Sequence, residues 1–390
     1  MINRVLKLPI GENSIFLFGP RQTGKTTLVI NALGNHKSVK INLLENETYL
    51  RYKASPQQFR EEIEFFAKNN EKAIVFIDEI QKVPELLNEI HLLIEKHKNK
   101  ITFILTGSSA RKMRKETSNL LGGRAWTFHL HPFTFQESGE SFNLEQTLRF
   151  GAMPPIIEKN EKAIIRTLNS YVQTYLKEEI SNEALVRNLQ AFTRFLDIAC
   201  DCSGEIVNYS TIGRETGVAS KTVKQYYQIL EDTLIAFQLD PYLKSMRKRV
   251  VMHPKYYFFD IGVINAVCGR LESSPKPKTS LYGQLFEHFI VLELRKLIQY
   301  HEKPWKTYFW RTSNGAEVDL VLEIPEGKLY AIEIKSAENV APKELKGLKQ
   351  FLASYPEAKA LCVCNARHPY EKNDITFLPW RYFFSEVLNL

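Results

Sequence analysis

A short glycine-bounded segment near the N-terminus constrains the fold of this chain more than any other feature. It lies between the apolar run SIFLF at 14–18, expected to be a strand, and the run TTLVINAL at 26–33, expected to be a helix. Glycines allow the backbone to curl so that successive N–H groups face one point, where the helix N-terminus adds partial positive charge. The segment therefore predicts a phosphate-binding loop, built from Gly19, Pro20, Arg21, Gln22, Thr23, Gly24, Lys25, Thr26 and Thr27.

A second pattern supplies the acidic groups that such a loop needs. The run IVFI at 74–77 is typical of a buried strand, and Asp78 and Glu79 follow directly at its end. We expect Asp78 to bind Mg²⁺ together with the hydroxyl of Thr26, and Lys25 to contact the β- and γ-phosphates. Glu79 would orient and deprotonate the attacking water. The two patterns in this order predict an ATP·Mg²⁺ site.

Strand-like runs alternate with helical stretches throughout residues 1–140. This alternation predicts an α/β domain with a parallel sheet covered on both faces. Together with the two motifs, it resembles the AAA+ superfamily of P-loop NTPases. The run ITFILTGSS at 101–109 is similar to that family's sensor strand, with Ser108 and Ser109 as candidates to orient water and Thr106 just before them.

The segment LGGR at 121–124 and the strand-like run after it resemble a group of prokaryotic AAA+ ATPases. The resemblance implies that Arg124 is an arginine finger or a sensor arginine acting on the γ-phosphate. The alternative is a surface arginine in a turn. A homo-oligomer is one expectation, because such an arginine acts either within its own chain or on a neighbouring copy.

Residues 141–249 are expected to be a helical linker followed by a winged helix–turn–helix. A helix at 209–216, a turn at 217–219, a helix from Ser220 and a strand in the run LIAFQLD resemble winged-helix domains. The second helix would present Lys221, Lys224 and Gln225 to DNA. A basic cluster would contact phosphates, formed by Lys244, Arg247, Lys248 and Arg249. The alternative role for this region is a lid or a protein-binding module.

Residues 250–390 combine β-rich runs with an amphipathic helix that carries Glu287. A hairpin follows, with Asp319 on its first strand and Glu333 and Lys335 on one face of its second strand. This arrangement resembles the restriction-endonuclease-like superfamily. The resemblance implies that Glu287, Asp319 and Glu333 hold Mg²⁺ or Mn²⁺, and that Lys335 polarises a water that attacks DNA. The alternative is an inactive relative of that fold.

Net charge and hydropathy narrow the class of protein. The formal net charge of +8 favours an acidic partner, of which nucleic acid is the commonest. No run of 18 or more apolar residues is present, so we expect no membrane span. The five cysteines lack metal-ligand spacing and are expected to be reduced thiols in a cytoplasmic protein.

Two functional hypotheses remain after the sequence analysis. In the first, ATP turnover controls a metal-dependent nuclease that acts on DNA. In the second, the chain is an ATP-dependent signalling or scaffolding switch whose nuclease-like domain is inactive. The presence of Glu287, Asp319, Glu333 and Lys335 together favours the first hypothesis.

Overall fold

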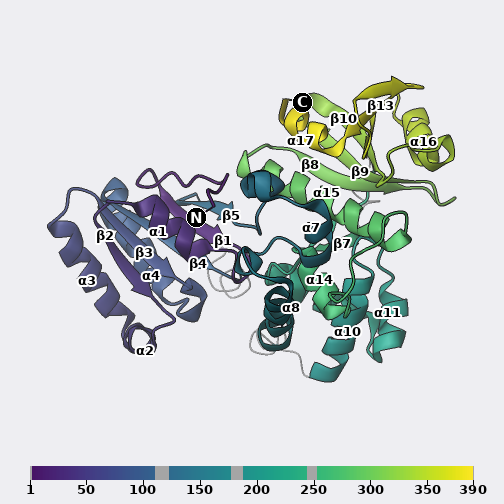
Figure 1. Cartoon of the computed structure of the whole chain (residues 1–390). Helices are drawn as coiled ribbons and strands as arrows, with labels where there is room; N and C mark the ends of the chain where they lie inside the picture. The colour runs from purple at the N-terminus through teal and green to yellow at the C-terminus, as the bar shows by residue number, and fades with distance from the viewer. Residues whose placement is uncertain (1, 110–122, 177–187, 244–252, 390) are drawn as a thin grey trace. The chain divides into compact units, whose positions relative to one another are not determined.

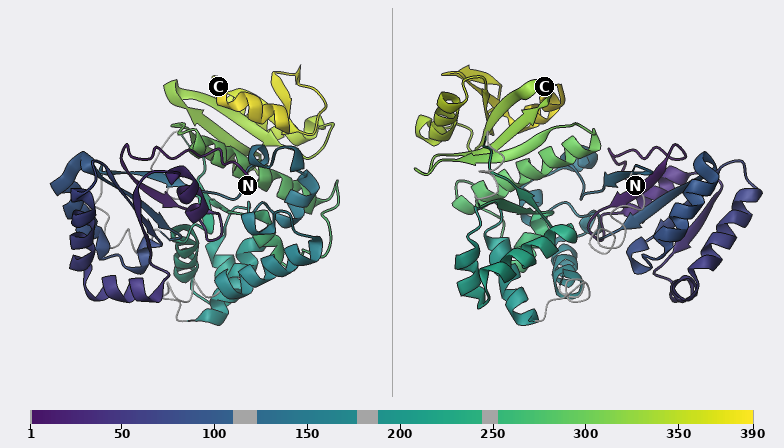
Figure 2. Two further views of the ribbon diagram at one scale, coloured as in Figure 1. Left: turned by 60° about the vertical axis from the view of Figure 1, so that its left-hand side comes forward. Right: turned by 180° about the vertical axis from the view of Figure 1, so that it is seen from behind.

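The computed structural model describes residues 2–109, 123–176, 188–243 and 253–389. The chain divides into two compact units, drawn in Figure 1 and, from two further sides, in Figure 2. The first unit comprises Met1–Ser138 and Leu230–Ile235, and the second comprises Gly139–Ile229 and Ala236–Leu390. Among the described residues, no helix combines the length and the apolar character that a bilayer span requires.

The first unit is built on a five-stranded sheet in which every paired strand is parallel to its neighbour. The strand order is β2-β3-β4-β1-β5. All residues of β3 and β4 are buried, as expected for central strands covered on both faces. The predicted parallel sheet is confirmed, with strands β1 (Ser14–Phe18), β2 (Ser38–Asn42), β3 (Ala73–Asp78), β4 (Ile101–Gly107) and β5 (Ala125–His129).

Amphipathic helices cover this sheet. In α3, Phe59, Ile63 and Ala67 recur at helical spacing and pack with Leu87 and Ile90 of α4 against the apolar side chains of β3 and β4. The polar side chains of these helices face the solvent. The helices of this unit are α1 (Lys25–Leu33), α2 (Asn46–Ala54), α3 (Pro56–Lys68), α4 (Leu86–His97) and α6 (Phe135–Ser138).

The second unit begins with helices and a short antiparallel strand pair. The predicted helix–turn–helix elements lie at the expected positions: α11 ends before Gly217, whose φ of 74° suits glycine, and α12 begins at Ser220. Strand β6 pairs with β7. These elements are α7 (Leu144–Phe150), α8 (Glu161–Ser170), η5 (Tyr171–Leu176), α10 (Leu189–Asp201), α11 (Tyr209–Thr216), α12 (Ser220–Asp232), β6 (Ala236–Leu239) and β7 (Lys255–Phe258).

A six-stranded mixed sheet forms the C-terminal part of the second unit, with strand order β12-β13-β11-β10-β9-β8. Strands β9 and β10 form the predicted antiparallel hairpin, whereas β10, β11 and β13 run parallel to one another. The elements are α14 (Ile261–Val267), α15 (Ser280–Tyr300), β8 (Lys306–Arg311), β9 (Glu317–Ile324), β10 (Lys328–Ile334), α16 (Lys346–Ser354), β11 (Lys359–Cys364), β12 (Tyr370–Lys372), β13 (Ile375–Pro379) and α17 (Trp380–Glu386).

The core of this sheet explains the two C-terminal cysteines. Cys362 and Cys364 are fully buried at alternate positions of β11, and they pack in one apolar cluster with Leu348 and Phe351 of α16. They are free thiols. Their spacing therefore reflects a buried strand face, as the sequence predicted.

Candidate functional site

Three strands of the first unit end at the same edge of its sheet. Phe18 of β1 lies opposite Gly107 of β4, and Ile77 of β3 lies opposite Leu105 of β4. The residues that follow these strands are therefore neighbours, because parallel strands present their carboxyl ends at one edge. This register brings the predicted loop, the two carboxylates and the predicted sensor serine together.

The loop after β1 has the backbone geometry that its glycines allow. A Cβ on Gly19 would lie 2.3 Å from the Leu130 carbonyl oxygen, so no other residue fits there without a shift. Gly24 has a φ of 90° and directly precedes α1, and Gln22 also has a positive φ of 62°. Thr23 Oγ1 donates to the Pro20 carbonyl at 2.9 Å and closes the turn. The loop is a curled cradle at a helix N-terminus.

Lys25 is folded back onto this loop. Its Nζ donates to the carbonyl oxygens of Gly19 at 2.9 Å and Pro20 at 3.0 Å, and the residue is only 5% exposed. A buried ammonium whose hydrogen-bond partners here are carbonyl oxygens is available to a stronger anionic partner. Lys25 therefore lies where a phosphate on the cradle would meet it.

Thr26 and Asp78 meet across the edge of the sheet. Thr26 Oγ1 donates to Asp78 Oδ2 at 2.8 Å, and the buried Thr106 hydroxyl donates to Asp78 Oδ1. Hydroxyl and carboxylate oxygens are the hard ligands that Mg²⁺ prefers, and a nucleotide would add phosphate oxygens. The donor set fits Mg²⁺ held between the protein and a nucleotide.

Glu79 adopts a left-handed backbone conformation, with φ 60° and ψ 49°. Its N–H donates to Thr106 Oγ1 at 3.1 Å, and its carboxylate accepts a hydrogen bond from the Ser108 hydroxyl at 3.3 Å. Strain of this kind persists where surrounding contacts impose it. The result is a carboxylate aimed toward Ser108, one residue beyond the probable metal ligand Asp78.

Sequence reasoning missed Gln81. Its Nε2 donates both to Glu79 Oε2 and to Ser108 Oγ, the latter at 3.0 Å. Gln81 is 6% exposed, and its Oε1 accepts no hydrogen bond among the described residues. A Cβ on Gly107 would lie 2.9 Å from that oxygen, so the glycine leaves room for the amide. The only sequence signal was a polar residue two positions after Glu79.

Arg124 does not lie at this site within its own chain. It directly precedes β5, whose first residue, Ala125, lies opposite Ser14 at the start of β1. The loop begins at the other end of β1, roughly 16 Å away for five strand residues. Arg124 is paired with Glu95 of α4 instead, which lowers the pKa of that carboxyl. An arginine finger acting on a neighbouring copy stays a prediction.

The second unit brings the predicted C-terminal residues together. Ile332 lies opposite Leu320 in the hairpin, so Glu333 and Asp319 are on adjacent strands. Lys335 Nζ lies 2.6 Å from Glu333 Oε1 and 3.6 Å from Asp319 Oδ2. Asp319 Oδ2 also accepts a hydrogen bond from the Ile334 N–H at 2.7 Å. Hairpin geometry thus aligns three of the four predicted groups.

Glu287 of α15 approaches the same place but pairs with a different lysine, one that sequence reasoning missed. Lys255 of β7 lies with its Nζ 3.6 Å from Glu287 Oε1 and 2.5 Å from Glu317 Oε1, and its side chain is 3% exposed. Glu287 Oε1 also accepts a hydrogen bond from the Tyr257 hydroxyl at 2.8 Å. A lysine inside a fully buried strand was the signal in the sequence.

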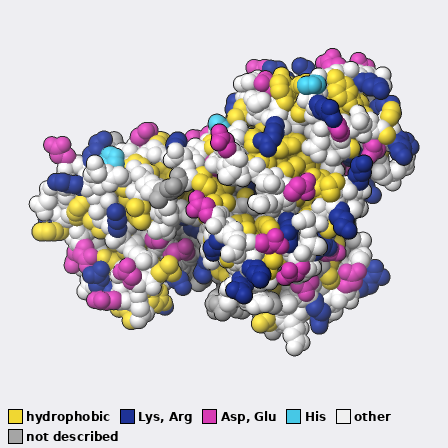
Figure 3. Space-filling model, in the orientation of Figure 1, with side chains coloured by type: hydrophobic (Ala, Val, Ile, Leu, Met, Phe, Trp, Pro, Cys, Tyr) yellow, Lys and Arg dark blue, Asp and Glu magenta, His cyan; other side chains and the backbone are white. Residues whose placement is uncertain are grey.

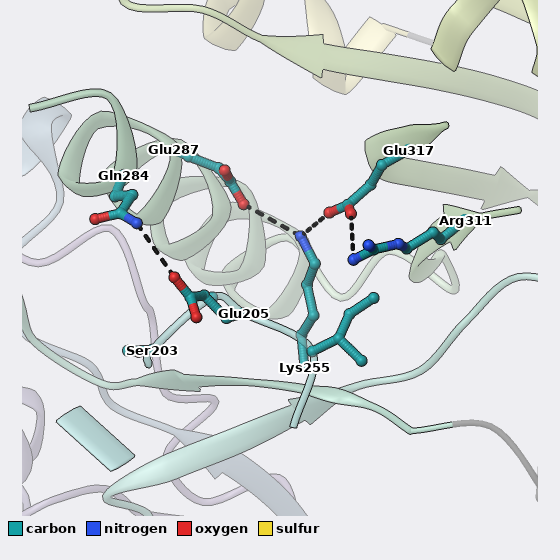
Figure 4. Close-up of a pocket in the computed structure, with 9 residues that line it drawn as sticks. Ser203, Glu205, Lys255, Gln284, Glu287, Arg311 and Glu317 are labelled. Atoms are coloured by element: carbon teal, nitrogen blue, oxygen red, sulfur yellow. Dashed lines mark hydrogen bonds and ion pairs between the residues drawn. The ribbon is translucent and has the colours of Figure 1, made fainter. Parts of the chain in front are cut away.

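These groups border a pocket of about 290 Å³, shown in Figure 4. Lys255 points between the carboxylates of Glu287 and Glu317, and Arg311 approaches Glu317 from β8. Glu205 accepts a hydrogen bond from Gln284 on the opposite side. The pocket is therefore charged and polar, with acidic and basic groups already paired.

Burial and mutual repulsion shift the titration of this cluster. Burial raises the pKa of Glu287 to about 7, with a further increase from Asp319, although Lys255 opposes the shift. Burial and Asp319 also raise the pKa of Glu333. Burial alone would lower the pKa of Lys255, but Glu287, Glu317 and Asp319 outweigh it, so the ammonium stays charged. The three predicted carboxylates thus interact with one another.

The cluster does not hold a metal-binding arrangement as it stands. Within the part of the chain that the structure describes, no three His, Cys, Asp or Glu residues are placed to bind one metal ion. We expected three carboxylates around one lysine, which would need a metal to offset their repulsion. That expectation is corrected here, because Lys255 is a second lysine that supplies positive charge directly.

The predicted DNA-facing residues of α12 are accessible. Lys221, Lys224 and Gln225 are exposed, and the Lys224 ammonium lies 5.1 Å from the centre of the Tyr209 ring. The basic cluster at 244–249 lies outside the described residues. On the face shown in Figure 3, Lys and Arg side chains are interspersed with Asp and Glu rather than gathered in one patch.

Comparison with known families agrees with the first site. Residues 11–139 match the model of a family described as an AAA domain. The N-terminal part of this chain is a P-loop ATPase domain of the AAA type. Two further families match the rest of the chain, each described as a domain of unknown function: DUF8612 over residues 141–274 and DUF4143 over residues 282–383.

Similar proteins occur in bacteria and archaea. An uncharacterized protein of Mycobacterium tuberculosis is 25% identical over 363 residues, covering 92% of this chain and 78% of the relative. One from Haemophilus influenzae is 21% identical, covering 71% and 72%, and one from Methanocaldococcus jannaschii is 22% identical, covering 76% and 70%. The similarity thus extends beyond the ATPase domain.

Two solved structures share parts of the fold. The Aeropyrum pernix ORC1 protein, solved in complex with DNA, has a TM-score of 0.32 and 11% identity, covering 66% of this chain and 86% of ORC1. Domain III of the Thermotoga maritima replication initiation protein DnaA has a TM-score of 0.25 and 16% identity, covering 58% and 86%. Because both scores are low, the assignment of the ATPase domain rests on the family match and the site.

Proposed function

We propose that this protein binds ATP·Mg²⁺ on the loop from Gly19 to Thr27, hydrolyses it with Glu79, and uses the cycle to control the second unit. The observation that carries the proposal is the contact network at one sheet edge, in which Thr26 meets Asp78 and Ser108 meets Glu79. Each contact joins groups that the sequence assigned separately to the metal, the phosphates and the water.

Each residue has a definite task in this mechanism. The loop N–H groups and the N-terminus of α1 bind the phosphates, and Lys25 exchanges its carbonyl partners for phosphate oxygens. Thr26 and Asp78 would hold Mg²⁺, which neutralises charge on the phosphates. Glu79 accepts a proton from the attacking water, and Ser108 helps to orient that water. The contacts of Glu79 with Ser108 and Gln81 hold the carboxylate in a fixed direction before ATP arrives.

The test separates binding from turnover. Glu79→Gln should bind ATP with wild-type affinity but release phosphate at least ~100-fold more slowly, because an amide cannot accept the proton. Nucleotide binding by calorimetry and phosphate release are measured on the same preparation. Glu85→Gln, a change at an exposed glutamate nearby, is the control and should leave both unchanged. Hydrolysis by Glu79→Gln at the control rate would remove Glu79 from the mechanism.

We also propose that the second unit acts on DNA. The support is the net charge of +8 and the exposed Lys221, Lys224 and Gln225 on α12. Binding of duplex DNA should weaken steeply with salt, because neutralised phosphates release counterions. Gel shifts at two salt concentrations compare wild type with Lys221→Glu/Lys224→Glu, with the charge-matched Lys343→Glu/Lys346→Glu as control. Equal binding by both double variants would make α12 a lid or a protein-binding element.

Metal-dependent DNA cleavage is a second candidate function. One observation favours it: Glu287, Asp319, Glu333 and Lys335 come from separate elements and interact in one cluster. The alternative is a switch with an inactive cluster. Plasmid nicking with Mg²⁺ or Mn²⁺, with and without ATP, distinguishes them. Nicking that Asp319→Ala and Lys335→Ala both abolish, with ATP hydrolysis retained, supports cleavage; no nicking by wild type supports the switch.

A further inference from the structure

Lys255 occupies an unusual position for a cation. It begins β7, yet its ammonium reaches side chains of α15 and β9, at 3.6 Å from Glu287 Oε1 and 2.5 Å from Glu317 Oε1. Its side chain is 3% exposed, so almost none of the charge is solvated by water. Burial of an ammonium is costly unless paired charges compensate for it. The compensation here comes from carboxylates on two other elements.

The acidic groups around Lys255 outnumber the lysines. Glu287, Glu317, Asp319 and Glu333 form the cluster, against Lys255 and Lys335. Arg311 adds a partly exposed partner, 3.3 Å from Glu317 Oε2. Removing one buried cation would therefore leave closely spaced carboxylates with little to offset their repulsion.

One carboxylate oxygen points independently to an unmet need for positive charge. Glu333 is 5% exposed, and its Oε2 accepts no hydrogen bond from any described residue. Its other oxygen pairs with Lys335. A buried carboxylate oxygen without a donor is costly, and a cation or a donor placed beside it would lower that cost. The cluster thus has both a resident cation and an unused acceptor.

We propose that the Lys255 ammonium takes the position of a divalent cation in this cluster, and that it excludes metal while it is paired with Glu287 and Glu317. The ammonium already uses the carboxylate oxygens that a metal would need, and a divalent ion beside it would meet direct repulsion. The inference uses the same cluster as the DNA-cleavage candidate and adds its regulation: metal enters only when Lys255 leaves these carboxylates.

Direct metal binding tests this without any DNA. Full-length protein free of nucleotide is titrated with Mn²⁺, and free Mn²⁺ is followed by its electron paramagnetic resonance signal. Lys255→Met should bind one more Mn²⁺ per chain than wild type, or the same ion about tenfold more tightly or better. Lys255→Arg keeps the charge and should show no gain. Lys255→Met/Asp319→Asn should lose the gain, which separates this cluster from Mn²⁺ held by Thr26 and Asp78.

Each outcome decides the proposal. Equal Mn²⁺ binding by Lys255→Met and wild type overturns it, as does a gain that survives in the double variant or tight binding at Asp319 in wild type. If Lys255→Met unfolds in chelator, recovery of folding with Mn²⁺ supports the proposal, and failure of both Lys255→Met and Lys255→Gln to recover overturns it. DNA cleavage is not a readout, so loss of the cleavage candidate and failure of the Lys255 proposal are seen separately.

Discussion

The two charged sites of this protein satisfy their charges in opposite ways. In the ATPase domain, the Lys25 ammonium donates to the carbonyl oxygens of Gly19 and Pro20, while Asp78 accepts from hydroxyl groups. In the second unit, Lys255 and Lys335 are paired directly with carboxylates. The first site keeps opposite charges for an incoming ligand, and the second has already combined them.

This difference predicts opposite consequences for similar substitutions. Removing a charge from the first site should impair ligand binding and leave the fold intact, because the lost partners are neutral. Removing a charge from the second cluster should destabilise the fold, because a buried carboxylate is left unpaired. Lysine substitutions in each region therefore test the comparison directly.

The largest effect is expected for Lys25→Met. Loss of the phosphate-facing cation should weaken ATP binding ~100-fold or more, because charge-assisted contacts to phosphate are lost. The free energy of unfolding without nucleotide should change by less than about 1 kcal/mol, since methionine keeps the length of the stem. Calorimetric titration and thermal unfolding measure both quantities. Lys40→Met, at an exposed position of β2, is the control. A large loss of stability without nucleotide would break the comparison at this site.

Lys335→Met should have the reverse effect. It leaves Glu333 buried without its ion-pair partner, which should lower the free energy of unfolding of the second unit by ~3 kcal/mol. Lys328→Met on the same strand removes only an exposed pair with Glu326 and should cost ~0–1 kcal/mol. Urea unfolding is followed by tryptophan fluorescence, to which the second unit contributes most. Equal stability of the two variants would show that the Lys335 pair is not stabilising.

The pH dependence of stability should also distinguish the second cluster. The pKa of Glu287 is raised to about 7 from an ordinary value of 4.5, chiefly by burial. The folded state therefore keeps this proton while the unfolded chain releases it, so the contribution to stability falls as pH rises from about 4.5 to 7. Glu287→Gln removes that proton uptake.

The free energy of unfolding of wild type relative to Glu287→Gln should decline by about 2 kcal/mol across this window. Paired urea titrations at pH 5 and pH 7.5 measure the difference and cancel the contribution of other groups. A constant difference between the two proteins would mean that Glu287 has its ordinary pKa in the folded state.

The sequence predicted local features better than contacts across the fold. The phosphate loop, its strand and its helix follow from adjacent residues, and the hairpin that joins Asp319 to Glu333 follows from alternation and a turn. Lys255 could not be predicted, because its partners on α15 and β9 are set by packing rather than by spacing. The position of Arg124 depended on the register of β5 beside β1.

Gln81 shows the same limit at short range. It lies only two residues after Glu79, but its contact with that carboxylate depends on the left-handed turn at Glu79 and on the space beside Gly107. No period of helix or strand predicts such a contact. Its effect on turnover is therefore the finest test of how the first site differs from the second.

Gln81→Ala should slow ATP hydrolysis about tenfold and leave ATP affinity unchanged. The amide joins Glu79 to Ser108, so its loss frees the carboxylate to leave the direction from which it meets the attacking water. Gln81→Glu should slow turnover further, because a second carboxylate would repel Glu79 where an amide had donated to it. Gln57→Ala, on the exposed face of α3, is the control. Phosphate release under saturating ATP gives the turnover number, and calorimetry gives the affinity. A fall in affinity equal to the fall in turnover would mean that Gln81 supports the nucleotide cradle as a whole. Turnover at the control rate would mean that Ser108 and the backbone at Glu79 suffice to hold the carboxylate.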